Sequence, residues 1–434
     1  MTSPKYTSTL TSLLTMIGVA VGLGNVWRFP YMMGSYGGSA FLAVYLGFTL
    51  LFAFPALMAE MTLGRMSGKG TLDSFRIIFG NNIGGFIGLM LLVVITISGS
   101  YYVVVVANVI YTSAYSIIFG FGRDNIEGFK SGLNYPQLQY GITLLLIATS
   151  LFVIHKGLTR GIEWLSKIIM PFFLLAMGYM IFNALSLPGA LDKFTEFLSP
   201  DLSRLHATEI FAALGQAFFS VGLGGTFVVV YAAYINQNES IPKMALLTGL
   251  GDVSASLLVS LFLVPSMLVF GMDMASGPGL IFDTFPRLFA TMPAGRWIGS
   301  LFLIALTLVA FLSLIAAYQV PFVSIQNERP ELPPKKTLVA IGVVQGMLAL
   351  PCAFSPDLIG ILDLIFGSGM QVLGSALCVL GITWGYTRLT ARESLFTSSG
   401  NTTIQKLAFA WIKWIIPLAL LAVLAGYVYD SFMN

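Results

Sequence analysis

Long apolar runs fill almost the whole chain, and short polar segments separate them. A helix of about 20 apolar residues crosses the roughly 30 Å of hydrocarbon in a bilayer. Continuous runs, rather than ten-residue segments of alternating polarity, favour helices over a transmembrane barrel. The pattern therefore predicts an all-α polytopic membrane protein with eleven spanning helices, placed at 11–33, 40–63, 84–119, 137–154, 162–187, 207–234, 243–270, 295–325, 336–353, 358–387 and 407–429.

Composition agrees with this setting and excludes several classes of function. Only 9% of the 434 residues are charged, against about 25% in soluble domains, and a net charge of +3 gives no footprint for nucleic acid. Cys352 and Cys378 stand alone in apolar runs, so neither a disulfide framework nor a CxxC metal site is indicated. His155 and His206 lie near the ends of runs, and the chain has no HExxH, GxSxG or phosphate-loop motif, so no enzyme is predicted.

The basic residues predict the orientation in the membrane. With a cytoplasmic N-terminus, fourteen lysines and arginines fall in cytoplasmic segments and seven in outer ones, as the positive-inside rule requires. The first run is interpreted as a spanning helix rather than a cleaved signal, because it is long and leads directly into Asn25 and Arg28. We expect a multi-pass protein of the plasma membrane, and the short loops favour a bacterial inner membrane.

Residues 17–30 interrupt the first apolar run with glycines, an amide and a guanidinium. An unpaired peptide group in hydrocarbon costs several kcal/mol, so a helix loosened by Gly22 and Gly24 needs protein, ligand or ion to satisfy its backbone. Close packing of helices through small residues is the alternative for the glycines alone. Polar groups at membrane depth such as Asn25 and Arg28 favour a buried binding site.

A second interruption lies at 215–226, in the sixth run. Breaks at corresponding positions of two halves indicate an inverted-repeat transporter. The predicted organisation is a cytoplasmic segment 1–10, repeats at 11–187 and 207–387, loops at 188–206 and 388–406, and a last helix with an outer C-terminus at 407–434. Because each broken helix presents free N–H groups on one half and free C=O groups on the other, the two breaks suit a zwitterion with a sodium ion.

Specific motifs also occur at these positions. The sequence Gly-x-Ala-Val-Gly-Leu-Gly-Asn-x-Trp-Arg-Phe-Pro occupies 18–30, and Gly-Gly-x-Ala-Phe occupies 37–41. Supporting matches are Glu60 with Gly64-Arg65, Tyr101-Tyr102, the segment 156–163, Gly161 with Pro171, and 216–234. From about Tyr6 to the end of the eleventh helix, the chain resembles the neurotransmitter:sodium symporter family, near its bacterial amino-acid transporters of the leucine-transporter type.

The resemblance implies a sodium-coupled symporter of a neutral amino acid that works by alternating access. The substrate carboxylate would meet the backbone of Leu23 and Gly24 and the Tyr102 hydroxyl, and the ammonium would meet carbonyls of Ala20, Phe219 and Ser220. The side chain of the substrate would point toward Val19, Ser98, Gly222, Gly225, Ser313 and Tyr318. The two glycines leave room for a hydrophobic or aromatic side chain unless Tyr318 fills it.

Two sodium sites are implied in the same way. The first would use Ala20, Asn25, Ser220 and Asp252, which supply hard oxygen ligands; Asp252 replaces the usual asparagine. The second would use Gly18, Val21, Ala310 and Ser313, but Leu314 stands where the family has a hydroxyl, so one or two ions remain possible. Tyr45, Gln216 and Ser256 align with the family's chloride region, and we expect Asp252 to replace the charge of chloride, so that transport does not need this anion.

The resemblance also places the gates. Arg28 and Asp363 align with the outer charged pair, while Lys5 and Glu328, with Tyr234 nearby, are the nearest candidates for the inner one. For Gly161 and Pro171, local unwinding and a simple proline kink are both open. The alternatives in function are a sensor or channel of the same fold without transport, and proton-coupled uptake through Glu60 or Asp252.

Overall fold

A computed structural model describes residues 5–122, 124–199, 206–274, 277, 279–396 and 402–433. All regular secondary structure in these ranges is helical, which confirms the predicted class. The expected loops 188–206 and 388–406 lie partly outside the described residues.

The first half of the chain contains the helices of the first predicted repeat, with π-helical turns marked η, and the short helix α10 in the loop that follows it. They are α1 (Thr9–Ala20), η1 (Gly24–Arg28), α2 (Phe29–Ser35), α3 (Ser39–Phe48), η2 (Thr49–Ala53), α4 (Phe54–Ser67), α5 (Thr71–Phe79), α6 (Asn81–Ile118), α7 (Ile126–Leu133), α8 (Pro136–His155), η3 (Leu158–Glu163), α9 (Trp164–Leu185) and α10 (Ala190–Phe197).

The second half begins with another short, interrupted pair. Its elements are α11 (Ala207–Ser220), α12 (Phe227–Ala232), α13 (Ile241–Phe270), η5 (Leu280–Thr284), α14 (Phe285–Thr291), α15 (Gly295–Glu328), α16 (Pro334–Phe354), α17 (Asp357–Leu362), η6 (Asp363–Met370), α18 (Gln371–Trp384), α19 (Arg388–Phe396), α20 (Thr403–Ala410), η7 (Trp411–Ile415) and α21 (Ile416–Met433).

The helix lengths are consistent with the predicted number of spans. In the described residues, nine helices are long and apolar enough to cross a membrane, and the bent pair at the N-terminus makes a tenth. The expected sixth span corresponds to α11 and α12, which are too short to qualify separately. The short helices α5, α7, α10 and α14 lie in segments that the hydrophobic pattern treats as loops.

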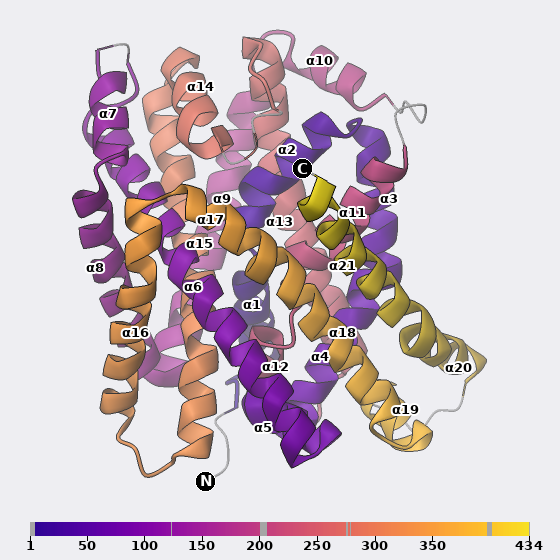
Figure 1. The fold of residues 1–434 in the computed structure, drawn as a ribbon. Coiled ribbons are helices and arrows are strands. Elements are labelled where there is room, and N and C mark those ends of the chain that lie inside the picture. The colour runs from indigo at the N-terminus through magenta and orange to yellow at the C-terminus, as the bar shows by residue number, and fades with distance from the viewer. Residues whose placement is uncertain are drawn as a thin grey trace.

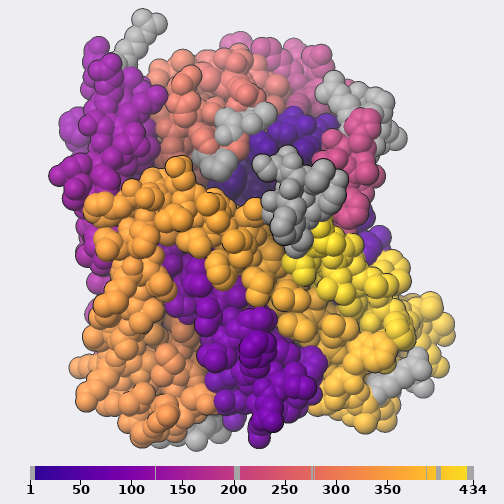
Figure 2. Space-filling view, viewed as in Figure 1, coloured from indigo at the N-terminus to yellow at the C-terminus, as the bar shows by residue number. Residues whose placement is uncertain are grey.

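Figure 1 shows the broken helices at the centre of the molecule, with α1 and α12 enclosed by longer helices. The N-terminus, α5, α19 and α20 lie at one end, and α7, α10 and α14 lie at the other. The longest helices, α6 and α15, pack against each other. In the space-filling view, the indigo segment near α2 lies in a hollow beside the salmon segment around α14 (Figure 2).

Both predicted breaks are present. In the first, α1 ends at Ala20, Val21 takes an extended conformation, and the next helix continues at 63° to α1. In the second, residues 221–226 separate α11 from α12, and Gly222 and Gly225 both have φ of +68°. Because this left-handed region is readily accessible only to glycine, these two residues fix the path of the second break.

Candidate functional site

A cavity of about 130 Å³ lies between the two breaks. Its wall combines backbone from both broken helices with side chains from α6, α15 and η6. The lining residues are Val19, Ala20, Gly22, Leu23, Gly24, Asn25, Ile95, Ser98, Gly99, Tyr101, Tyr102, Phe219, Ser220, Gly222, Phe227, Ser313, Ala317, Asp363, Gly367 and Gln371. The structure therefore brings most of the sequence-predicted substrate residues into one place.

Two predicted substrate residues do not line this cavity. A Cβ on Gly225 would meet the Gly374 carbonyl oxygen at 3.0 Å, so this glycine faces α18 instead. Tyr318 is fully buried behind Gly99, with its ring 3.0 Å from the position of a Cβ there. Tyr318 therefore does not fill the cavity.

Phe227 is the lining residue of most consequence that sequence reasoning missed. Its ring occupies the space that a side chain on Gly222 would need, so the volume freed by that glycine is already used. Ile95 and Gly99 could have been found by periodicity, because they lie three residues before Ser98 and Tyr102 on α6 and residues at this spacing share a helix face. Phe227 gave no such signal.

The Tyr102 hydroxyl is placed to accept or donate a hydrogen bond at the cavity wall. It lies beside the backbone of Leu23 and the Ser313 hydroxyl, yet it has no hydrogen bond of normal geometry within the described residues. The Ser98 hydroxyl is in the same situation. An unpaired buried hydroxyl costs about 1–3 kcal/mol, so a polar ligand group here would recover a hydrogen bond.

A buried polar cluster adjoins the cavity and is centred on Asp252. Asn25 Nδ2 donates to Asp252 Oδ1 at 2.7 Å, and Ser220 Oγ donates to Asp252 Oδ2 at 2.5 Å. Asn25 Nδ2 also lies 2.8 Å from Ser256 Oγ, and Asn25 Oδ1 accepts from the Gly22 N–H. Carboxylate, hydroxyl and carbonyl oxygens of Ser220, Asp252 and Ser256 therefore lie together around the Asn25 amide, which turns its Nδ2 toward them. Oxygens of these kinds are the hard ligands that an alkali cation takes.

The residues of the second predicted sodium site fit an ion less well. Ser313 Oγ donates to the carbonyl of Val21 at 2.9 Å and also lies 3.3 Å from that of Val19. Leu314, beside it on α15, is fully buried and offers no oxygen. Of the two adjacent positions on α15, only Ser313 therefore offers a side-chain oxygen to this predicted site.

Tyr45 and Gln216, predicted as part of the charge-balance region, are both fully buried, and Tyr45 lies close to Asp252. The Tyr45 hydroxyl and both polar atoms of the Gln216 amide have no hydrogen bond of normal geometry within the described residues. Ser256 is bonded to Asn25 and to the Asp252 carbonyl. The residues that would surround an anion are thus present, and a carboxyl group already stands among them.

The predicted outer gate is not closed in this structure. Asp363 Oδ1 accepts a hydrogen bond from the Tyr101 hydroxyl at 3.0 Å, while the Arg28 guanidinium lies 4.2 Å from the centre of the Phe219 ring. Among the described residues no ion pair joins Arg28 to Asp363. Asp363 nevertheless lies on the cavity wall, and Arg28 lies over the ring of Phe219, another residue of that wall.

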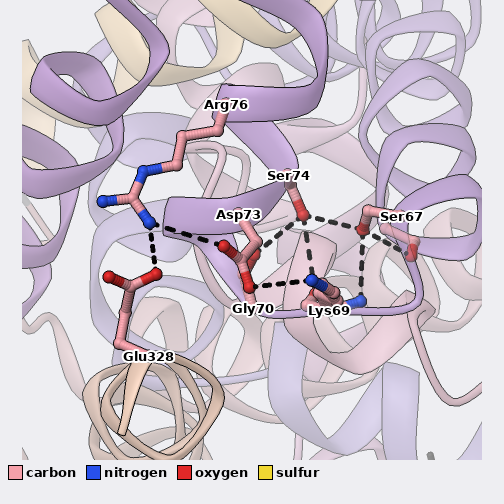
Figure 3. Close-up of polar contacts among 8 residues, drawn as sticks. Ser67, Lys69, Gly70, Asp73, Ser74, Arg76 and Glu328 are labelled. Atoms are coloured by element: carbon pink, nitrogen blue, oxygen red, sulfur yellow. Dashed lines mark hydrogen bonds and ion pairs between the residues drawn. The ribbon is translucent and has the colours of Figure 1, made fainter. Parts of the chain in front are cut away.

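The predicted inner pair takes different partners, so the expected pairing of Lys5 with Glu328 is wrong for this structure. Lys5 Nζ donates to the carbonyls of Ala233 and Ile235 at 2.8 and 3.1 Å, whereas Glu328 pairs with Arg76 (Figure 3). Burial lowers the pKa of the Lys5 amine, and the charge of Arg65 adds to this effect.

The structure also shows the surroundings of Tyr234 and the conformation of the segment from Gly161 to Pro171. The Tyr234 hydroxyl accepts from Gln319 Nε2 at 3.2 Å, which connects the end of α12 to α15. Gly161 lies in the π-helical turn η3, and α9 remains helical through Pro171. The segment therefore begins as a π-helical turn and continues as an α-helix that is not interrupted at Pro171.

Glu60 holds the second break in place. It is fully buried on α4, and its Oε1 accepts the backbone N–H of Gly224 at 2.9 Å. In the described residues no group of three or more histidine, cysteine, aspartate or glutamate side chains could hold a metal ion. The buried Glu60 carboxyl thus supports the backbone of the second break.

The chain is similar over most of its length to sodium-dependent transporters. An uncharacterized sodium-dependent transporter of Haemophilus influenzae is 24% identical over 96% of both chains. One from Methanocaldococcus jannaschii is 30% identical over 78% of this chain and 72% of that one. The crystal structure of MhsT in complex with L-phenylalanine has a TM-score of 0.86 at 26% identity and covers 98% of this chain and 99% of that chain.

A match to a protein-family model agrees with these similarities. The family model matches residues 3–125 and 121–431, which together include both breaks, the Asp252 cluster and the cavity wall. The relatives are transporters rather than enzymes, in agreement with the expectation from the sequence. The chain belongs to the sodium:neurotransmitter symporter family.

Proposed function

We propose that this protein couples the uptake of a neutral amino acid with a hydrophobic or aromatic side chain to sodium entry, by alternating access. The observation that carries the proposal is the cavity between the two breaks, with the Asn25–Asp252–Ser220 cluster beside it. A zwitterion in this cavity would have the backbone of Leu23 and Gly24 for its carboxylate and carbonyl groups at the two breaks for its ammonium.

The lining supports a neutral, apolar side chain. Among the described residues, Asp363 is the one charged side chain on the cavity wall, and it accepts a hydrogen bond from Tyr101 at the predicted outer gate. Ile95, Phe219, Phe227 and Ala317 supply apolar surface, and a charged substrate side chain there would lose solvation without a partner. The L-phenylalanine bound to MhsT points to the same class of substrate.

We further propose that the protein binds one sodium ion per transport cycle and that transport does not require chloride. The ion would be held by oxygens of Ala20, Asn25, Ser220 and Asp252, and it travels as co-substrate. Asp252 brings a negative charge into a region where the chain also retains Tyr45, Gln216 and Ser256, so an added anion would meet electrostatic repulsion. The lack of a second hydroxyl at Leu314 favours a single ion over two.

Uptake of radiolabelled amino acids into proteoliposomes tests the proposal. We expect concentrative uptake only with an inward sodium gradient, competition by large apolar and aromatic amino acids, and full activity when gluconate replaces chloride. Competition by glycine and alanine alone would reject the substrate class. A strict requirement for chloride would reject the role of Asp252.

A proton-coupled transporter is the second candidate, because Glu60 and Asp252 are both fully buried carboxyl groups next to the breaks. Concentrative uptake without sodium under an imposed pH gradient would select it. A ligand sensor of the same fold would bind substrate without moving it. Exchange of labelled for unlabelled substrate across the membrane would exclude the sensor.

A further inference from the structure

The short helix α5 connects the second break to the end of α15. Thr71 Oγ1, at the start of α5, lies 3.4 Å from the carbonyl of Thr226 in the break. Phe75 is fully buried, and its ring lies 3.2 Å from the position that a Cβ on Gly225 would take. The helix α5 therefore packs directly against the backbone that shapes one side of the site.

Besides its packing on α6 and α18, α5 also contacts α15. Gly70, just before α5, approaches so closely that a Cβ there would be 2.9 Å from Ser324 Oγ. One turn from the end of α5, Arg76 forms an ion pair with Glu328. Figure 3 shows Arg76 reaching from α5 to Glu328, with Asp73 on its other side and Lys69 beyond. The Asp73 carboxylate lies 3.6 Å from Arg76 and 3.5 Å from Lys69.

The position of Glu328 explains why it needs a cation. It is the last residue of α15, where the unpaired carbonyls make the helix end negative and a carboxylate is unfavourable. Arg76 supplies the compensating charge from a separate element. Lys5 does not compete for Glu328 here, because its amine is already bonded to the carbonyls at the end of α12.

We propose that Arg76 is the positioning residue of the inner gate: its ion pair with Glu328 fastens α5 to α15 and closes the side of the cavity that faces the N-terminal end. This inference rests on the proposed transport function and assigns the inner latch to a residue outside the predicted Lys5–Glu328 pair. Inward opening then requires the Arg76–Glu328 contact to break and α5 to move from the second break.

The exposure of the pair suits a contact that opens and closes repeatedly. The side chains of Arg76 and Glu328 are 31% and 35% exposed, so water can replace the contact at small cost. Ion pairs at this degree of exposure contribute up to about 1 kcal/mol, which corresponds to about a fivefold change in an equilibrium. This is enough to shift the balance between two states without fixing one of them.

Cys378 provides a reporter for the movement of α5. Its Sγ lies 3.3 Å from the position of a Cβ on Gly225, the same point that the Phe75 ring approaches. Cys378 is fully buried, and the only other cysteine of the chain is Cys352. With Cys352→Ser as background, a membrane-impermeant maleimide added to inside-out vesicles reports how often the region behind α5 opens to the N-terminal side.

We expect Arg76→Gln and Glu328→Gln each to accelerate labelling of Cys378 about fivefold, with no further increase when they are combined. The charge-reversed pair Arg76→Glu with Glu328→Arg should return labelling toward the rate of the background protein. The matched control is Arg329→Gln, because Arg329 follows α15 directly but pairs with Glu331; it should leave the rate unchanged.

Unchanged labelling in both single variants, or acceleration by Lys5→Gln that exceeds that by Arg76→Gln, would overturn the assignment. Failure of the charge-reversed pair to slow the labelling, with thermal stability retained, would do so as well. The labelling needs no transport, so it is independent of the proposed function. Absence of sodium-driven uptake by the wild-type protein would reject that function and leave the labelling result interpretable.

Discussion

Arg28 Nη2 donates a hydrogen bond to the Tyr427 hydroxyl at 3.2 Å and thereby connects η1 to the last helix, α21. The room for this contact depends on Gly215 of α11, where a Cβ would lie 2.9 Å from the same hydroxyl. The predicted outer gate needs the Arg28 guanidinium at Asp363. The structure therefore indicates two alternative partners for one side chain.

Tyr427→Phe is expected to favour the closed outer gate. A hydrogen bond to a charged group contributes about 1.5–3 kcal/mol, and its loss leaves Asp363 as the stronger partner of Arg28. Because gate closure traps bound substrate, the apparent KM for uptake should fall, by about tenfold or more. Tyr140→Phe is the control, since it removes a hydroxyl that donates to the Gly346 carbonyl far along the chain. An unchanged KM in Tyr427→Phe would show that Tyr427 does not hold Arg28.

Asp252→Asn is expected to make transport depend on chloride. The substitution keeps the size of the side chain and removes the negative charge from the cluster with Asn25 and Ser220. Chloride could then supply the missing charge among Tyr45, Gln216 and Ser256. Uptake by the variant should therefore be lost in gluconate and recovered in chloride, while the wild-type protein is equally active in both. Equal activity of the variant in both anions would contradict this role of Asp252.

The sequence predicted the breaks better than it predicted their surroundings. Glycines beside polar groups in an apolar run are a local signal, so the positions around Gly22 and Gly222 could be found directly. Asn25 and Asp252 could be related only through the family motif, because 227 residues separate them along the chain. Nothing local distinguishes them as neighbours.

The partners of the gating residues could not be predicted for a related reason. Arg76 and Tyr427 look like an ordinary basic loop residue and an ordinary interfacial tyrosine. Their contacts with Glu328 and Arg28 arise from the packing of α5 and α21 against distant helices. The short helix α5 itself was missed because nine residues of mixed polarity between two spans resemble a loop.

Leu314→Ser is expected to create a second functional sodium site. The new hydroxyl would follow Ser313 in the chain, at the position where the resemblance to the family implies a ligand. The Hill coefficient for sodium activation of uptake should rise from near one to near two. Leu314→Ala is the matched control, because both variants lose the buried leucine, at about 2–5 kcal/mol, but only serine adds an oxygen. A wild-type coefficient near two would contradict the single-ion proposal.

Phe227→Leu is expected to widen the range of substrates toward larger side chains. The Phe227 ring occupies the space next to Gly222 on the cavity wall, and a smaller side chain would free part of this volume for the substrate. Changes of this size in an apolar pocket alter discrimination by about 1–3 kcal/mol, so the ratio of kcat/KM for tryptophan over leucine should rise at least about tenfold. Tyr318→Phe should leave the ratio unchanged, because Tyr318 lies behind Gly99 and outside the cavity. The reverse pattern, with selectivity following Tyr318 rather than Phe227, would mean that the substrate side chain points to the other side of α6.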